Sequence, residues 1–71
     1  MQLFIVRWTD QDADKFVCTS SYSTAQKKFK EILKESKKNS EISVKDIDEA
    51  IEIANLKSKT DVIALINRLN Q

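Results

Sequence analysis

Three aspartates alternate with other residues in the stretch WTDQDADKF, at Asp10, Asp12 and Asp14. Carboxylates at the first, third and fifth positions of a loop open an EF-hand calcium site. That site also needs glycine at its sixth position and a bidentate glutamate at its twelfth, where this chain has Lys15 and Ser21. A polar hairpin turn, in which aspartates accept hydrogen bonds from nearby backbone amides, explains the same residues without a metal. We therefore predict a turn here and no metal site.

Catalysis has few side chains to draw on, because the 71 residues include no histidine and no glycine. The commonest general base and the glycine-rich phosphate loop are thus both missing. The single cysteine, Cys18, excludes an internal disulfide, and its neighbours in KFVCTS indicate a buried structural thiol. Asp46 and Glu49 would share a helical face, but carboxylates there also suit the start of a helix. We predict a protein that is not an enzyme, with no catalytic residue and no cofactor.

A group of lysines with few carboxylates among them is the second candidate site. It comprises Lys27, Lys28, Lys30, Lys34, Lys37 and Lys38. Such a face could follow a phosphate backbone, but it has no arginine for bidentate contacts and no aromatic row for base stacking. The segment 41–52 is acidic and the formal net charge is only +1. Weak, sequence-independent nucleic-acid binding through these lysines is therefore the alternative function, and binding to a membrane is not expected.

The third candidate is the apolar surface of the first predicted strand, in QLFIVRW. Alternation places Phe4, Val6 and Trp8 on one side and Leu3 and Ile5 on the other, so both faces of the sheet are apolar. Two helices in so short a chain would cover one face well, and an exposed apolar face usually marks an interface. Phe4, Val6 and Trp8 are the predicted partner-binding residues, although a place for Trp8 in the core is an equally good interpretation. A second copy of the chain and a different protein both remain open as the partner.

These residues are positioned by elements that the pattern of residue types predicts. Residues 2–8 and 15–20 are rich in β-branched and aromatic residues and predict an antiparallel hairpin. Apolar residues at helical spacing predict a helix near 23–38, capped by Ser23 or Thr24, and another near 59–70, where Ser58 and Asp61 match a capping box.

The segment 43–54 fits two interpretations. Val44, Ile47 and Ile51 follow a helical spacing, whereas AIEIAN alternates as a strand does. We favour a strand around 49–54, because a third strand completes a usable sheet. The predicted fold is α+β, in the order ββαβα, with a small antiparallel or mixed three-stranded sheet and two helices on one face. The alternative is a β-hairpin with three helices.

The C-terminal stretch IEIANLKSKTDVIALINRLN resembles the endings of small phage proteins, particularly marine ones. The matching residues are Ile51, Glu52, Ile53, Lys57, Lys59, Leu65, Ile66, Leu69 and Asn70. The stretches FIVRWTD and TSSYSTAQKKFKEI also resemble those proteins, whereas Ala54 departs from them, since they have proline there. The resemblance implies a strand-strand-helix-strand-helix fold and a viral origin, and it implies no activity.

These observations predict one domain, 1–71, that acts as a small protein–protein interaction module. Its partner would be a host protein, if the chain is a phage-encoded modulator, or a second copy of the chain in a homodimer. The apolar run QLFIVRW is shorter than the about 20 residues that cross a bilayer, and it lacks the features of a signal peptide. We therefore expect a cytoplasmic protein, in the host cytoplasm if phage-encoded.

Overall fold

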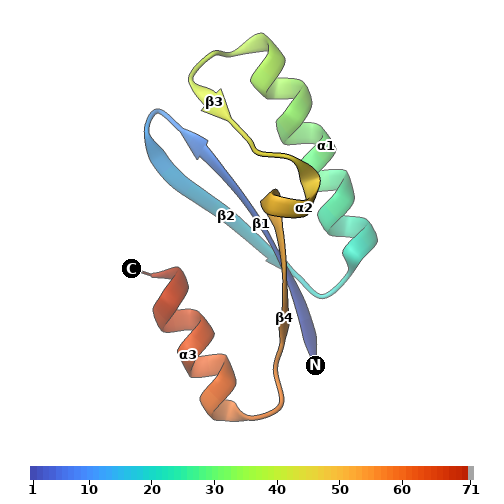
Figure 1. Ribbon diagram of the computed structural model, residues 1–71, viewed down its shortest axis with the longest axis vertical. Helices are drawn as coiled ribbons and strands as arrows, with labels where there is room; N and C mark the ends of the chain where they lie inside the picture. The colour runs from blue at the N-terminus through green and yellow to red at the C-terminus, as the bar shows by residue number, and fades with distance from the viewer. Residues whose placement is uncertain (71) are drawn as a thin grey trace.

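The computed structural model describes residues 1–70, which form an antiparallel sheet with helices packed against it, so the predicted α+β class is confirmed. Along the chain the elements are β1 (Gln2–Asp10), β2 (Ala13–Thr19), α1 (Tyr22–Lys38), β3 (Ile42–Ser43), α2 (Ile47–Ala50), β4 (Ile51–Asn55) and α3 (Lys59–Leu69) (Figure 1). Within residues 1–70, no helix has the length and apolar character needed to cross a membrane.

The aspartate-rich stretch is the turn of the β1–β2 hairpin, as predicted. Asp10 pairs with Ala13, and the two residues between them, Gln11 and Asp12, have φ angles of 52° and 64°. Positive φ at both central residues is what a two-residue hairpin turn requires, because its twist matches that of the strands. Asp12 tolerates this conformation, and the chain has no glycine to use instead.

Strand β1 is the centre of the sheet. It pairs with β2 along one edge, while β4 and the two-residue β3 share its other edge. All pairings are antiparallel. The sheet has one short strand more than predicted, but it is still three strands wide, because β3 and β4 lie one after the other along the same edge of β1. Strand β2 is therefore an outer strand, paired on one side only.

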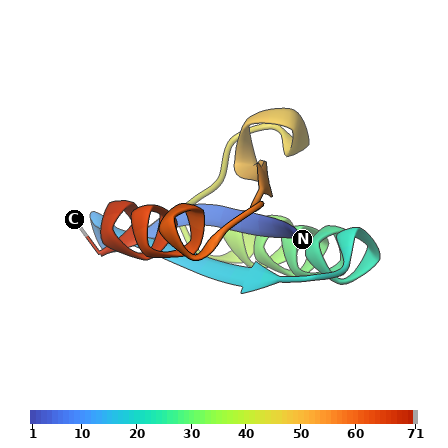
Figure 2. The same cartoon turned by 90° about the horizontal axis from the view of Figure 1, so that it is seen from below.

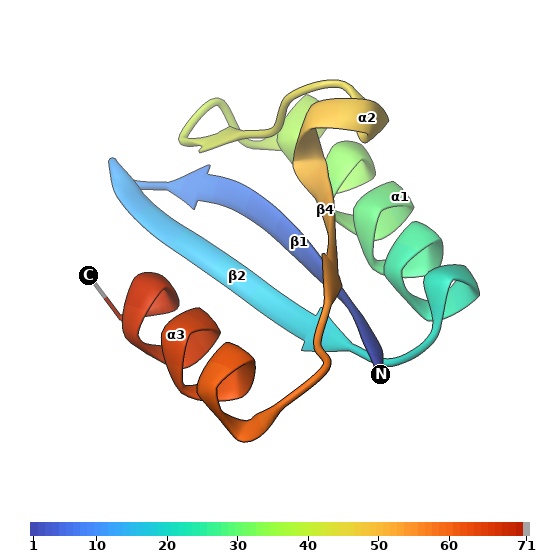
Figure 3. The ribbon, with the colours of Figure 1, turned by 60° about the horizontal axis from the view of Figure 1, so that its bottom comes forward.

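The two long helices lie on opposite faces of the sheet, which corrects the prediction that both cover one face (Figure 2). Phe4 and Val6 pack against α1, whereas Leu3 and Ile5 pack against α3 and the segment before it. The physical reason lies in β1 itself, because its two apolar faces each need a covering element. Figure 3 shows the sheet strands between the two helices.

Local signals set the ends of both helices. The hydroxyl of Ser21 accepts a hydrogen bond from the amide of Thr24, so α1 begins one residue before the predicted start and is capped by Ser21, not by Ser23 or Thr24. At α3 the predicted cap is confirmed. The Ser58 hydroxyl accepts from the Asp61 amide, and the Asp61 carboxylate accepts from the Lys57 amide at 2.8 Å.

The ambiguous central segment contains both structures that its pattern allows. One helical turn, α2, ends at Ala50, and the chain continues directly into β4 at Ile51. The predicted strand near 49–54 is thus present but lies slightly later. Alternation then places Ile51 on the α1 face and Glu52 on the α3 face, opposite Ile5 of β1.

We predict that the centre of β1 carries much of the stability of the fold. Ile5 has no exposed surface, so Ile5→Val should lower the free energy of unfolding by about 0.5–1.5 kcal/mol, since it leaves a methyl-sized cavity. Ile53→Val makes the same change at a side chain with 53% of its surface exposed and should cost less than about 0.5 kcal/mol. Urea unfolding of both variants measures the difference, and equal losses would contradict the packing described here.

Candidate protein-interaction surface

The three predicted partner-binding residues lie on the face of β1 that α1 covers. Phe4 and Val6 are buried in the core there, so they present no surface to a partner, and their prediction as contact residues is wrong. Trp8 is partly buried against the same cluster, and the ammonium of Lys28 lies 5.6 Å from the centre of its ring. This placement suits a tryptophan at the edge of the core.

The outer edge of β2 is the most accessible part of the sheet. Five of its seven residues are exposed, and within residues 1–70 its outward edge has no neighbouring strand. Phe16 and Cys18 lie opposite Arg7 and Ile5 of β1, so both face the α3 side. Phe16 is 42% exposed and Cys18 is exposed as well, which corrects the expectation of a buried thiol. The reason is that Cys18 is on an outer strand that α3 covers only in part.

Helix α3 is held on the sheet by few side chains. Leu65 is the only residue of the helix that is buried, with Val62 and Leu69 partly buried beside it. Ile63 and Ile66 remain 58% and 51% exposed. Single exposed apolar residues are normal on a protein surface, whereas several that adjoin one another usually mark an interaction site.

An ion pair shows which way the two flanks of α3 face. The Arg68 guanidinium donates two hydrogen bonds to the Glu52 carboxylate of β4, at 3.0 and 2.5 Å, so this flank of α3 faces β4. At roughly 100° per residue, Ile63 and Ile66 lie about 140–160° around the helix from Arg68. They therefore point away from β4, toward the open edge of β2. Phe16, Cys18, Ile63 and Ile66 share that edge of the α3 face, and we call them the edge strip.

The Glu52 carboxylate joins three elements through charge. Besides Arg68 of α3, it accepts a hydrogen bond from Arg7 of β1 at 3.0 Å. The hydrogen bond from Arg68 is the main reason that the pKa of Glu52 is lowered, and partial desolvation opposes it. The same hydrogen bond raises the pKa of Arg68 above its ordinary value. Glu52 of β4 therefore links α3 and β1 through charge, on the flank of α3 that lies opposite the isoleucines.

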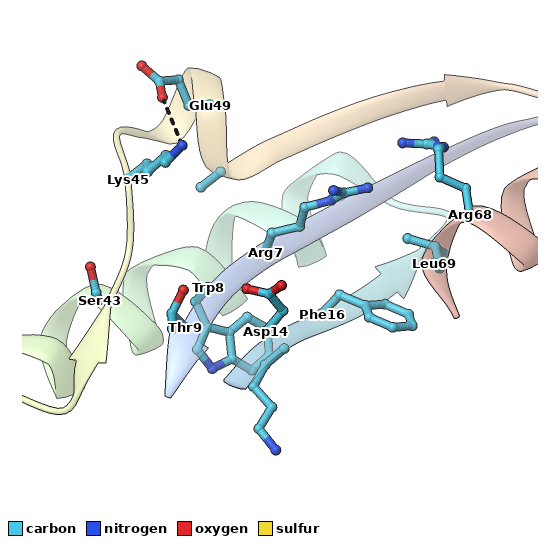
Figure 4. A pocket seen from close by; sticks show the side chains of 12 residues that line it. Arg7, Trp8, Thr9, Asp14, Phe16, Ser43, Lys45, Glu49, Arg68 and Leu69 are labelled. Carbon is cyan, nitrogen blue, oxygen red and sulfur yellow. Dashed lines mark ion pairs between the residues drawn. The ribbon is translucent and has the colours of Figure 1, made fainter. Parts of the chain in front are cut away.

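A shallow pocket lies on the α3 face beyond the end of the helix (Figure 4). Its volume is about 390 Å³, and Phe16, Asp14 and Glu49 are among the residues that line it. Its charges are already paired in part, since Lys45 lies 3.9 Å from Glu49 and Arg7 contacts Glu52. In the described chain no buried side-chain nitrogen or oxygen lacks a hydrogen-bond partner, and no three carboxylates or thiols gather as metal ligands would. The pocket therefore offers no reactive constellation.

The lysines of α1 divide into two groups. Lys27, Lys30, Lys34, Lys37 and Lys38 are exposed and fall within roughly 100° of the helix surface, so they form one stripe. Lys28 lies elsewhere, between Trp8 and Glu31, whose carboxylate is 3.9 Å away. Over residues 1–70, no ion pair joins the stripe to the acidic segment 41–52. The stripe is thus an exposed positive face on the side of the molecule opposite the edge strip.

The chain matches no family model, no curated protein and no solved structure. Sequence reasoning missed the edge strip, although one signal was available: Ile63 and Ile66 are apolar residues outside the stripe of Val62, Leu65 and Leu69 that faces the sheet.

We predict that the Glu52 cluster gives α3 a stability that depends on pH. Because the folded-state pKa of Glu52 is lowered, its contribution is present above the pKa of the unfolded chain and is lost as pH falls through the folded-state pKa. Glu52→Gln should therefore unfold at a lower urea concentration than the wild type at pH 7, and this difference should shrink toward about pH 3.

The matched control is Glu49→Gln, which breaks a longer pair between two well-exposed side chains and should leave the unfolding midpoint almost unchanged. A Glu52→Gln effect of the same size at pH 3 and pH 7 would contradict a role for the Glu52 charge.

Proposed function

We propose that this chain is a small, non-enzymatic protein–protein interaction module that works through the edge strip and the open edge of β2. The observation that carries the proposal is an apolar strip beside an unpaired strand edge, on one side of the molecule. Exposed edges attach readily to other strands, and natural proteins usually protect them with proline, bulges or charges. Here β2 has no proline, and its C-terminal half, FVCT, has no charge.

The amount of exposed surface supports the same proposal. A monomeric globular protein of 8.2 kDa exposes about 4,500 Å² on average, whereas this chain exposes 5320 Å². The excess is about 800 Å², close to what each partner buries in a protein interface of standard size. The chain thus exposes more surface than an average monomer of its mass, as expected of a protein that binds a partner. The partner on this surface is either a second copy of the chain or, in the phage setting that the sequence resemblance implies, a host protein in the host cytoplasm.

Sequence-independent nucleic-acid binding is a second candidate, and the unpaired lysine stripe of α1 is the observation that favours it. It ranks lower because the stripe has neither arginines nor exposed aromatic rings to add to the phosphate contacts. The two candidates use opposite sides of the molecule and differ in their response to salt. For each tenfold rise in salt concentration, the association constant for duplex DNA falls by about 0.9 log units per phosphate contact. Binding through apolar contacts does not weaken in this way.

We predict that association with protein depends on the edge strip. The double variant Ile63→Lys, Ile66→Lys should lose binding because it places two charges where apolar contact is needed. The chain should still fold, because both side chains are more than half exposed. The measurement is the protein retained by the immobilised chain, from its own purified solution and from a plausible host lysate, after nuclease treatment. It is made near 1 M salt, where the Debye length is about 3 Å.

The matched control is Lys30→Gln, Lys34→Gln, which changes two residues of the opposite face and should retain the same protein as the wild type. Circular dichroism verifies that both variants are folded. Two results would overturn the proposal and favour the lysine stripe. One is loss of binding in Lys30→Gln, Lys34→Gln but not in Ile63→Lys, Ile66→Lys, and the other is retention of nucleic acid and nothing else at low salt.

A further inference from the structure

The unpaired edge of β2 can pair antiparallel with the same edge of a second copy, because its stretch FVCT carries no charge that would repel itself. We propose that a second copy of this chain binds there by pairing β2 antiparallel with the partner's β2, about a twofold axis that passes Val17. The inference rests on the proposed function and adds the partner and the register. The two sheets would then continue as one.

The geometry of strands limits where the axis can lie. Directly paired residues of one sheet point to the same face, and faces alternate along β2. A twofold axis perpendicular to the sheet must therefore pass through a residue and not between two residues. Near the middle of β2 the choices are Phe16, Val17 and Cys18.

Charge and overlap distinguish these three registers. An axis at Phe16 sets Lys15 against the partner's Val17 and brings the two lysines close on the diagonal, which costs energy. An axis at Cys18 leaves only three residues of each strand paired. An axis at Val17 pairs five residues, sets Phe16 against the partner's Cys18, and sets Lys15 against the partner's Thr19. In that register the two Lys15 side chains are about 14 Å apart along the strand.

The same axis joins the α3 helices. Both copies carry α3 on the same face of the joined sheet, because the axis is perpendicular to it. The flank with Ile63 and Ile66 points toward the open edge of β2, so the two flanks approach each other above the new strand pair. The Phe16–Cys18 pairs lie beneath them. All four residues of the edge strip are then covered by one contact.

Crosslinking tests the register directly. In a Cys18→Ser background, Val17→Cys places two thiols at directly paired positions, with Cα atoms about 4.5–5.5 Å apart, within the range of a disulfide. With oxidised glutathione as the oxidant, this variant should form a covalent dimer. Lys15→Cys in the same background is the matched control and should remain a single chain, because its two thiols are too far apart.

A second pair of variants leaves Val17 intact. Neither Lys15→Cys nor Thr19→Cys alone should crosslink in the Cys18→Ser background, but an equal mixture of the two should give a mixed dimer. Sedimentation equilibrium of the Cys18→Ser chain under reducing conditions should show a dimer, weakened by Ile66→Lys.

Two results would overturn the inference. Crosslinking of Lys15→Cys alone, without crosslinking of Val17→Cys or the mixture, would exclude the Val17 register. A monomer at every concentration would exclude the second copy, and it would leave the proposed function standing if the edge strip still retains a different protein from lysate.

Discussion

The structure depends on one constraint, which is that the central strand β1 is apolar on both faces. Both faces need a covering element, and both edges of β1 are paired with other strands. Ile5 and Val6 are adjacent, have no exposed surface and point to opposite faces, so each one needs its own cover. Helix α1 supplies the larger cover, with Ala25, Phe29 and Ile32 buried against the sheet. Helix α3 supplies the other with Leu65 alone buried. Because β3 and β4 complete one edge of β1 and β2 the other, nothing remains to cover the outer edge of β2.

The incomplete cover explains why charge contributes to the arrangement of α3. A helix with one buried side chain has little apolar contact to define its rotation, and the bidentate pair between Arg68 and Glu52 adds a directional contact. With Arg68 on the β4 flank, Ile63 and Ile66 lie on the opposite flank and remain exposed, as Phe16 does. The chain is too short to supply another element beside β2, so the outer edge of β2 stays unpaired and the exposed apolar residues lie next to it. A small domain often makes up such a deficit by association, since it buries a smaller share of its surface alone.

Much of the local structure could be predicted from the sequence. Short-range patterns of residue types predict the hairpin, both long helices and the cap at Ser58, because each pattern is compatible with few other local structures. The central segment could not be assigned to one structure because it holds both, a helical turn to Ala50 and a strand from Ile51. Phe4 and Val6 were placed on the surface by the assumption that both helices share a face. The alternation of β1 shows which residues need cover, but only tertiary packing determines which cover each face receives.

Amide hydrogen exchange of β2, measured as a function of protein concentration, tests most directly whether the outer edge of this strand pairs with a second chain. In a single chain, alternate amides of β2 point outward and exchange quickly, while those of β1 are bonded on both sides. If two copies pair through β2, the outward amides around Val17 should become protected from exchange as the protein concentration rises, while the protection of the β1 amides stays constant. Fast exchange of those amides at every concentration would contradict this pairing and show that the edge of β2 stays open.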